Sequence, residues 1–255
     1  MKELVIMKLK ICHLYPELMN IYGDRGNIIA LSYRGKAKGI EVEVLNISLG
    51  EKFEPKKYDL VFIGGGEDKQ QQLVSEDFQK IKGKALGEAA SEGVVILGIC
   101  GGYQLFGKYY RPHEGPDLPG INLLDIYTVA GKKRMIGNVI ISSGPWAQGS
   151  GLHRLVGFEN HGGKTYLGDK VKPLGKVEVG FGNNGEDKKE GAVFKNVFGT
   201  YLHGSLLPKN PHFTDFLLKR ALERKYKKEI KLKEINSSLE ILAHKKAIER
   251  AYKTH

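Results

Sequence analysis

The sequence predicts an α/β fold with a mostly parallel sheet and helices on both faces of that sheet. Short apolar segments typical of strands alternate with segments of helical spacing. The predicted strands cover residues 9–14, 41–47, 58–63 and 94–99, and helices are expected to begin near residues 24 and 69, with Asp24 as the N-cap of the first. Glycine-rich turns follow the third and fourth strands. In a parallel sheet both turns lie at the carboxyl edge, where ligands bind.

Length and composition indicate a globular protein. A chain of 255 residues, 41% of them hydrophobic, can form a core in one large or two small domains. The two cysteines, Cys12 and Cys100, exclude a disulfide framework and fit a reducing compartment. Residues 1–7 are too short and too charged for a signal peptide, and no apolar run approaches the about 18 residues of a membrane span. We therefore expect a cytoplasmic protein without a membrane span.

Positive charge is concentrated at the C-terminal end. The net charge is +11, and the residues from Lys219 onward include 12 Lys or Arg against 5 Glu. We divide the chain into a main domain, residues 8–226, and a basic helical tail, residues 227–255. Such a tail could bind anionic lipid, nucleic acid or an acidic partner. A solvated helical face is the simpler interpretation, and without interleaved aromatics or a nucleic-acid motif we expect no nucleic-acid partner.

Cys100 lies where a buried strand turns into a helix. The glycines at 98, 101 and 102 around it match the G-x-C-x-G pattern of a nucleophile elbow, where neighbouring Cβ atoms would clash. The amides at the start of the helix point at the sulfur and favour the reactive thiolate. The alternative is a small buried apolar residue. The three glycines favour the nucleophile, since they otherwise have no explanation.

A thiolate that attacks an amide or ester carbonyl needs N–H donors aimed at the developing oxyanion. Gly101, directly after the cysteine, is one candidate donor. The turn Gly64–Gly66 offers a second, through Gly65 or Gly66, because glycine lets the backbone approach a ligand closely. A plain strand-to-helix turn is the alternative. A phosphate loop is disfavoured because no Gly-Lys-Ser/Thr follows.

The nucleophile also needs a base, and His203 is the best candidate among eight histidines. It follows a short apolar segment, residues 197–202, that indicates another strand. His161, within Gly157–Gly163, is the competitor. No pair of histidines has the i, i+4 spacing of a helical metal site, so we predict no metal.

Several motifs then reveal a family resemblance. The sequence resembles class I glutamine amidotransferases of the cobyric acid synthase type, which carry in this order the motifs found at Ile63–Asp68, Gly98–Gln104, Gly157–Thr165 and Gly199–Gly204. Two further stretches, Leu14–Asn27 and Gly182–Asp187, look more closely like the glutaminase subunits of lipid II isoglutaminyl synthases. The resemblance runs from about Leu9 to Arg224. It implies the flavodoxin-like class I amidotransferase fold for residues 8–226.

The resemblance also implies roles for single residues. Cys100 would attack the side-chain amide of L-glutamine, forming a thioester and releasing ammonia, and His203 would move the proton. Arg134 matches a family arginine linked to glutamine binding, and a guanidinium suits both oxygens of the α-carboxylate. Gln104 stands where relatives place a glutamine near the substrate. The alternatives are a surface cation for Arg134 and a sheet-facing side chain for Gln104.

One position departs from the family pattern. Many relatives carry a glutamate two residues after the histidine, where this sequence has Ser205. Either a Cys–His dyad suffices or an acid comes from elsewhere. The resemblance implies an aspartate from a MurT-like Mur ligase subunit, and Glu159 or Asp187 are the alternatives within the chain. Our hypothesis is that the chain alone is a poor glutaminase.

The resemblance further implies a heterodimer. The Mur-ligase-like partner would use ATP and Mg²⁺ to activate the D-glutamate of lipid II, which it would amidate to D-isoglutamine with ammonia from this chain. No cofactor is expected in this chain, because it contains no ATP-site motif. Its positive charge is compatible with work at the inner face of an anionic membrane. Rival interpretations are a glutaminase for a corrinoid-type acid, a cysteine hydrolase or redox sensor of the same fold, and a non-catalytic scaffold.

Overall fold

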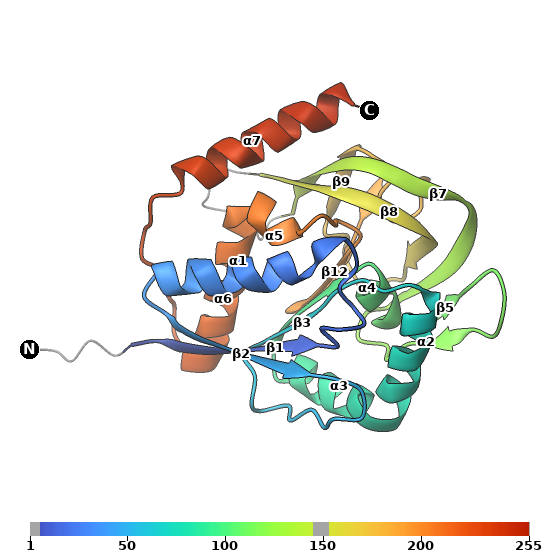
Figure 1. The fold of residues 1–255 in the computed structure, drawn as a ribbon, viewed down its shortest axis with the longest axis horizontal. Helices are drawn as coiled ribbons and strands as arrows, with labels where there is room; N and C mark the ends of the chain where they lie inside the picture. The colour runs from blue at the N-terminus through green and yellow to red at the C-terminus, as the bar shows by residue number, and fades with distance from the viewer. Residues whose placement is uncertain (1–5, 145–152, 255) are drawn as a thin grey trace, which may run out of the picture.

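Two β-sheets form the centre of the computed structural model, which describes residues 6–144 and 153–254 (Figure 1). The first sheet has the order β11-β12-β4-β3-β1-β2, and only its β11–β12 pair is antiparallel. Its strands are β1 (Lys8–Leu14), β2 (Glu41–Ile47), β3 (Leu60–Ile63), β4 (Val95–Ile99), β11 (Ala192–Phe194) and β12 (Val197–Thr200). The predicted parallel sheet is confirmed. Residues 1–5 of the segment judged unlike a signal peptide lie outside the described residues.

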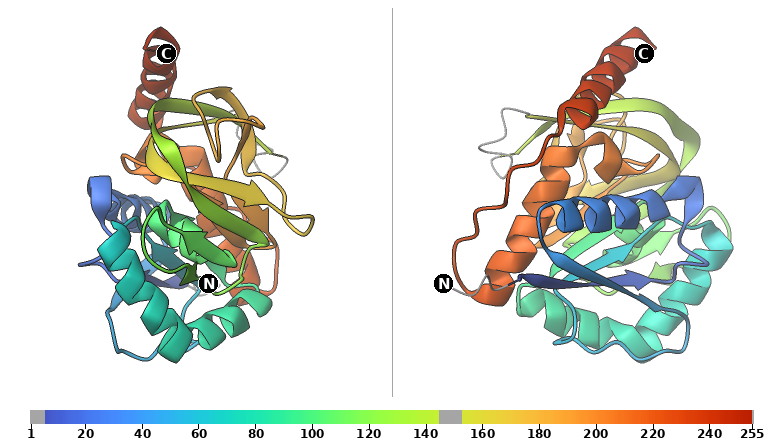
Figure 2. Two further views of the ribbon diagram at one scale, coloured as in Figure 1. Left: turned by 90° about the vertical axis from the view of Figure 1, so that its right-hand side faces the viewer. Right: turned by 60° about the vertical axis from the view of Figure 1, so that its left-hand side comes forward.

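Helices cover both faces of this sheet, as predicted (Figure 2). On one face lie α1 (Arg25–Ala37) and α6 (Pro211–Tyr226). On the other lie α2 (Asp68–Asp77), a π-helical turn (Phe78–Lys82), α3 (Gly83–Ser91) and α4 (Gly101–Leu105). Every residue of β3 and β4 is buried between these layers. Such continuous apolar strands are typical of a parallel sheet covered on both faces.

The second sheet was not predicted and is mostly antiparallel. It has the order β10-β9-β7-β5-β6, with β8 paired to β7. Its strands are β5 (Tyr109–Arg111), β6 (Leu118–Pro119), β7 (Ile126–Ser143), β8 (Arg154–Leu167), β9 (Gly175–Val179) and β10 (Lys189–Glu190). The long pair β7–β8 lies beside the end of the first sheet where α4 begins (Figure 1). It thereby forms a wall next to the predicted site.

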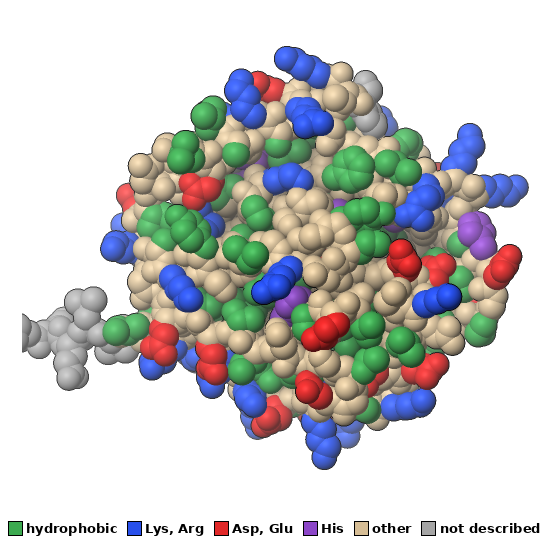
Figure 3. Space-filling view, viewed as in Figure 1, with side chains coloured by type: hydrophobic (Ala, Val, Ile, Leu, Met, Phe, Trp, Pro, Cys, Tyr) green, Lys and Arg blue, Asp and Glu red, His purple; other side chains and the backbone are tan. Residues whose placement is uncertain are grey.

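The chain ends in α5 (Leu206–Lys209), α6 and α7 (Ser238–Lys253). The predicted helix in the basic tail is therefore present, and it packs against the second sheet rather than standing free (Figures 1 and 2). Ala251 of α7 forms an apolar cluster with Ile140, Val156 and Val179. Basic side chains are scattered among acidic and apolar ones on the face drawn in Figure 3. Within the described ranges, no helix has the length and apolar character needed to cross a membrane.

Candidate active site

Cys100 sits in the turn between β4 and α4 with a φ of +49°, a region that non-glycine residues rarely adopt. The predicted elbow is present. Its glycines are explained by close packing: a Cβ at Gly98 would stand 2.5 Å from the Phe106 ring, and one at Gly102 would stand 2.8 Å from the Gly64 oxygen. Cys100 lines a cavity of about 580 Å³, together with the predicted Gln104 and Arg134.

The side chains of His203 and Cys100 both lie next to Gly65. A Cβ at Gly65 would lie 2.9 Å from Cε1 of His203 and 3.2 Å from Cβ of Cys100. Burial alone lowers the pKa of His203, but the Cys100 thiolate and the Asp24 carboxylate outweigh burial and raise it to about 10. Nε2 makes no hydrogen bond of standard geometry within the described chain, although the sulfur is near enough to act on the ring. Since Nδ1 faces Asp24, Nε2 is the atom left for the thiol.

Asp24 is the acid beside His203, and sequence reasoning missed this role. Its Oδ1 lies 3.4 Å from Nδ1 of His203, and both side chains are fully buried. It precedes α1 as predicted, but its side chain makes no capping hydrogen bond. The two in-chain alternatives lie elsewhere: Glu159 accepts the N–H groups of Phe181 and Gly182, and Asp187 accepts that of Lys189. No local signal distinguishes such an aspartate from an ordinary N-cap.

Two backbone N–H groups remain free beside Cys100. Gly101 is the first residue of α4, so its N–H has no intrahelical partner. The N–H of Gly66 has no acceptor in residues 6–144 and 153–254, and its nitrogen lies 3.0 Å from where a Gly101 Cβ would stand. The prediction for Gly65 is wrong, because its N–H is donated to Oδ2 of Asp24 at 2.7 Å.

Arg134 projects from β7 at the cavity wall. Its Nε and Nη2 donate to Oδ1 and the backbone oxygen of Asn160, at 3.0 and 3.2 Å. Nδ2 of Asn160 in turn donates to the Tyr22 hydroxyl at 2.6 Å, and the Tyr22 ring meets His203 edge-on, with centroids 5.1 Å apart. The guanidinium is exposed, and within residues 6–144 and 153–254 its hydrogen bonds go to Asn160 and not to a carboxylate. It is therefore available to an anionic group in the cavity.

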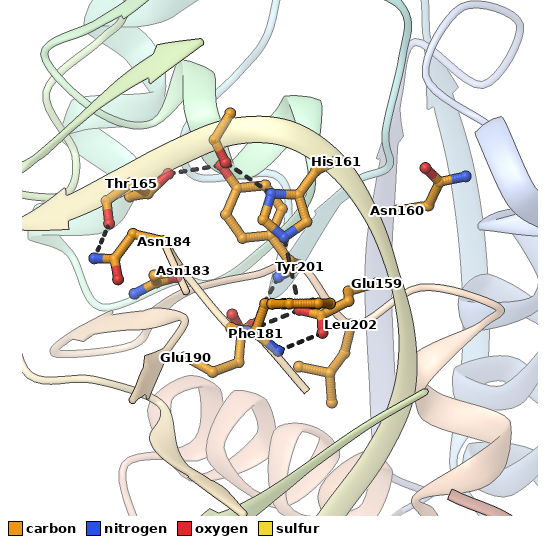
Figure 4. Close-up of polar contacts among 12 residues, drawn as sticks. Glu159, Asn160, His161, Thr165, Phe181, Asn183, Asn184, Glu190, Tyr201 and Leu202 are labelled. Carbon is orange, nitrogen blue, oxygen red and sulfur yellow. Dashed lines mark hydrogen bonds and ion pairs between the residues drawn. The ribbon is translucent and has the colours of Figure 1, made fainter. Parts of the chain in front are cut away.

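Gln104 belongs to a buried polar cluster that borders the same cavity. Its Nε2 donates to the Tyr201 hydroxyl at 3.0 Å, which also bonds Oγ1 of Thr165 at 2.6 Å. His161 stacks on Tyr201 with centroids 3.5 Å apart, while Asn160 points away from this cluster (Figure 4). Nδ1 of His161 contacts the Gly163 oxygen at 2.8 Å. His161 thus lines the cavity, but no contact joins it to Cys100, and His203 is the histidine placed as the base.

Asn183 and Asn184, from the stretch Gly182–Asp187, stabilise the backbone around this cluster. Asn183 exchanges two hydrogen bonds with Gly191, and Oδ1 of Asn184 accepts the N–H groups of Glu186 and Asp187. We find no cluster of three or more His, Cys, Asp or Glu side chains suited to a metal ion among the described residues.

A thiol held next to a buried imidazole, below two free amide N–H groups, suits hydrolysis of an amide through a covalent intermediate. On this fold that chemistry is characteristic of class I glutamine amidotransferases. The chain belongs to the CobB/CobQ-like glutamine amidotransferase family, whose domain model matches residues 10–211. It is therefore an amidotransferase subunit, in agreement with the resemblance found in its motifs.

Individual relatives extend the similarity over nearly the whole chain. The lipid II isoglutaminyl synthase (glutamine-hydrolyzing) subunit GatD of Staphylococcus aureus is 44% identical over 244 residues, covering 96% of both chains. The GatD subunit of Streptococcus pneumoniae is 40% identical over 226 residues, covering 88% of this chain and 85% of its own. The structure of PurLQS from Thermotoga maritima has a TM-score of 0.60 at 18% identity, covering 87% of this chain and 100% of that one, and shows the shared fold alone.

Proposed function

We propose that this chain is the glutaminase subunit of a lipid II isoglutaminyl synthase. It would hydrolyse L-glutamine to glutamate and ammonia, which a Mur-ligase-like partner would use to amidate the D-glutamate of lipid II. Similarity to two GatD subunits along most of the chain supports the choice of reaction. The observation that carries the chemistry is that Cys100 lines the cavity while His203 lies between Cys100 and Asp24 and interacts with both.

In this mechanism Nε2 of His203 takes the proton of the Cys100 thiol. Burial lowers the pKa of His203, but the resulting thiolate and the Asp24 carboxylate raise it to about 10, which favours the imidazolium. The sulfur attacks the side-chain carbonyl carbon of glutamine, and the carbonyl oxygen becomes an oxyanion facing the N–H groups of Gly66 and Gly101. His203 gives its proton to the amide nitrogen, the C–N bond breaks and ammonia leaves. Water, deprotonated by His203, then cleaves the thioester to glutamate and regenerates the thiol.

Substrate selection in this proposal uses two side chains that line the cavity. Arg134 pairs with the α-carboxylate of glutamine, since its guanidinium offers parallel donors to two oxygens. Gln104, held by Tyr201, also faces the substrate in this proposal. Both side chains line the same cavity as the nucleophile.

The remaining parts of the reaction belong to the partner. ATP and Mg²⁺ would bind the Mur-ligase-like subunit, which would activate the D-glutamate carboxylate and produce D-isoglutamine for peptidoglycan. This chain would need no cofactor and would work in the cytoplasm, at the inner face of the membrane where lipid II is presented. Asp24 contacts His203 from within this chain, and an aspartate from the partner would add a second acid when the heterodimer forms.

The test measures ammonia released from L-glutamine and D-isoglutamine formed in lipid II by the purified heterodimer. We expect both products with the wild-type chain and neither with Cys100→Ala. Ammonia release without amidation of lipid II would instead support a glutaminase for another acid. Equal ammonia release with and without the partner would contradict our hypothesis that the free chain is a poor glutaminase.

A further inference from the structure

We propose that Asp24 is a positioning residue that fixes both the catalytic base and the oxyanion-binding turn through the two oxygens of one carboxylate. The inference rests on the proposed function, because it assigns parts of the same thioester mechanism. It also gives a task to the stretch Leu14–Asn27, for which the sequence offered none.

The first oxygen acts on the base. Oδ1 of Asp24 lies 3.4 Å from Nδ1 of His203, and both side chains have no exposed surface. A carboxylate at Nδ1 keeps the proton on that nitrogen in the neutral ring, which leaves Nε2 free to accept the thiol proton. The other titratable groups facing the ring are Cys100 and Tyr22, and Lys209 contacts the adjacent Gly204. Asp24 is therefore the acid that sets the tautomer.

The second oxygen acts on the turn. Oδ2 of Asp24 accepts the N–H of Gly65 at 2.7 Å. The approach requires glycine at position 64, where a Cβ would stand 2.9 Å from Cβ of Asp24 and 2.3 Å from the Met19 oxygen. The segment before α1 therefore holds the Gly64–Gly66 turn through a hydrogen bond from the N–H of Gly65.

The same segment also bonds the peptide group that joins Gly65 to Gly66. The N–H of Ile21 donates to the Gly65 oxygen at 3.1 Å. Because the C=O and N–H of a trans peptide point in opposite directions, this bond turns the N–H of Gly66 away from Ile21 and toward the cavity. One short loop consequently orients the imidazole and the oxyanion donor together, at residues far apart in the sequence.

The two roles can be separated by substitution. In Asp24→Asn, the amide oxygen can still accept the N–H of Gly65, but the NH₂ group then faces Nδ1 of His203. The ring proton moves to Nε2, which can no longer accept the thiol proton. Asp24→Ala removes both contacts. Glu17→Gln, which removes a charge from the same segment where it bonds Ser48, is the matched control.

The experiment uses the heterodimer and two readouts. We expect Asp24→Asn to lower kcat for glutamine at least about 100-fold, with KM within about twofold, and to move the alkaline limb of the pH profile to lower pH. Glutamate γ-semialdehyde adds to the thiolate and forms an oxyanion, so its affinity reports on the turn. We expect Asp24→Asn to keep that affinity within about twofold and Asp24→Ala to weaken it about tenfold or more.

A wild-type kcat and pH profile in Asp24→Asn would overturn the proposal, as would equal semialdehyde affinity in Asp24→Ala. If the variants do not fold, ¹⁵N spectra of wild-type His203 above its pKa still decide, because a proton on Nε2 contradicts the role of Asp24. A wild-type heterodimer that releases no ammonia would refute the proposed function, and the spectra would still test Asp24 on their own.

Discussion

Arg134 and Asn160 are joined by two hydrogen bonds across the paired strands β7 and β8, one to the side chain and one to the backbone of Asn160. This pairing orients the guanidinium at the cavity wall before any substrate binds. Asn160 also holds Tyr22, whose ring covers His203. The predicted carboxylate-binding residue and the predicted base are therefore linked through one amide.

We predict that Arg134→Lys raises KM for glutamine about tenfold or more with a smaller change in kcat, because an ammonium cannot form the paired contact to a carboxylate. Steady-state kinetics of the heterodimer measure this. Lys133→Met, a neighbour on β7 outside the cavity lining, is the control. An unchanged KM in Arg134→Lys would assign the α-carboxylate to another residue.

We predict that His203 stays protonated up to about pH 10 and that Cys100→Ala lowers its pKa, because the thiolate is a main cause of the increase. The pKa in the folded state lies above the ordinary 6.5. Protonation of His203 therefore stabilises the fold fully below pH 6.5, and that contribution is lost as pH rises through about 10. NMR titration of the imidazole in both proteins tests this. Equal pKa values would contradict the thiolate–imidazolium pair.

Tyr201→Phe is expected to lower the free energy of unfolding by about 1–3 kcal/mol, because it leaves the buried Nε2 of Gln104 without its partner, while Thr165 keeps its bond to Thr128. KM for glutamine should also increase, since Gln104 loses its anchor. Urea denaturation and kinetics give the two values. Tyr166→Phe removes a hydroxyl that bonds Glu186 at the surface and should have little effect on stability. Equal decreases in the free energy of unfolding in both variants would show that the buried hydroxyl of Tyr201 contributes no more to stability than the exposed one of Tyr166.

The buried ion pair between Lys82 and Asp77, at the end of α2 and in the π-helical turn, is expected to contribute strongly to the free energy of unfolding. Lys82→Met is expected to cost about 3–5 kcal/mol, because it leaves a buried carboxylate without its cation. Burial raises the pKa of Asp77, but hydrogen bonds from Lys82 and Tyr15 outweigh burial and lower it. This stabilisation is therefore present above the ordinary value of 3.8 and lost as pH falls below it.

The free energies of unfolding of wild type and Lys82→Met should accordingly become similar at acidic pH. Lys80→Met, which breaks an exposed pair with Glu76, serves as the control and should cost under about 1 kcal/mol. If the free energy of unfolding differed between wild type and Lys82→Met by the same amount at neutral and at acidic pH, the assigned role of the Lys82–Asp77 pair would be wrong.

The sequence allowed prediction of the features that local patterns encode. The apolar run before Cys100 and the glycines around it specify a strand and a strained turn, and topology then brings Cys100 and His203 to the same edge. Asp24 could not be found this way, because an aspartate before a helix has the pattern of an N-cap. The donor in Gly64–Gly66 depends on peptide orientation, which Ile21 and Asp24 set from another part of the chain. Local sequence does not contain that information.

The second sheet escaped prediction for a different reason. Its long strand β7 is interrupted by a charged stretch around Lys132 and Lys133, where the pairing with β8 shifts register. The periodicity of a strand is lost there, and only pairing with distant segments restores the sheet. The apolar face of α7 is equally hard to recognise, since small residues such as Ala247 and Ala251 provide part of it.

The position of α7 bears on how the protein is made. The ribosome completes the strands that carry Ile140, Val156 and Val179 well before it adds the helix that shields them. Until α7 is made, the nascent chain exposes this apolar surface. During that interval the partly folded chain is most prone to aggregate. This helix, α7, therefore covers residues that are synthesised well before it.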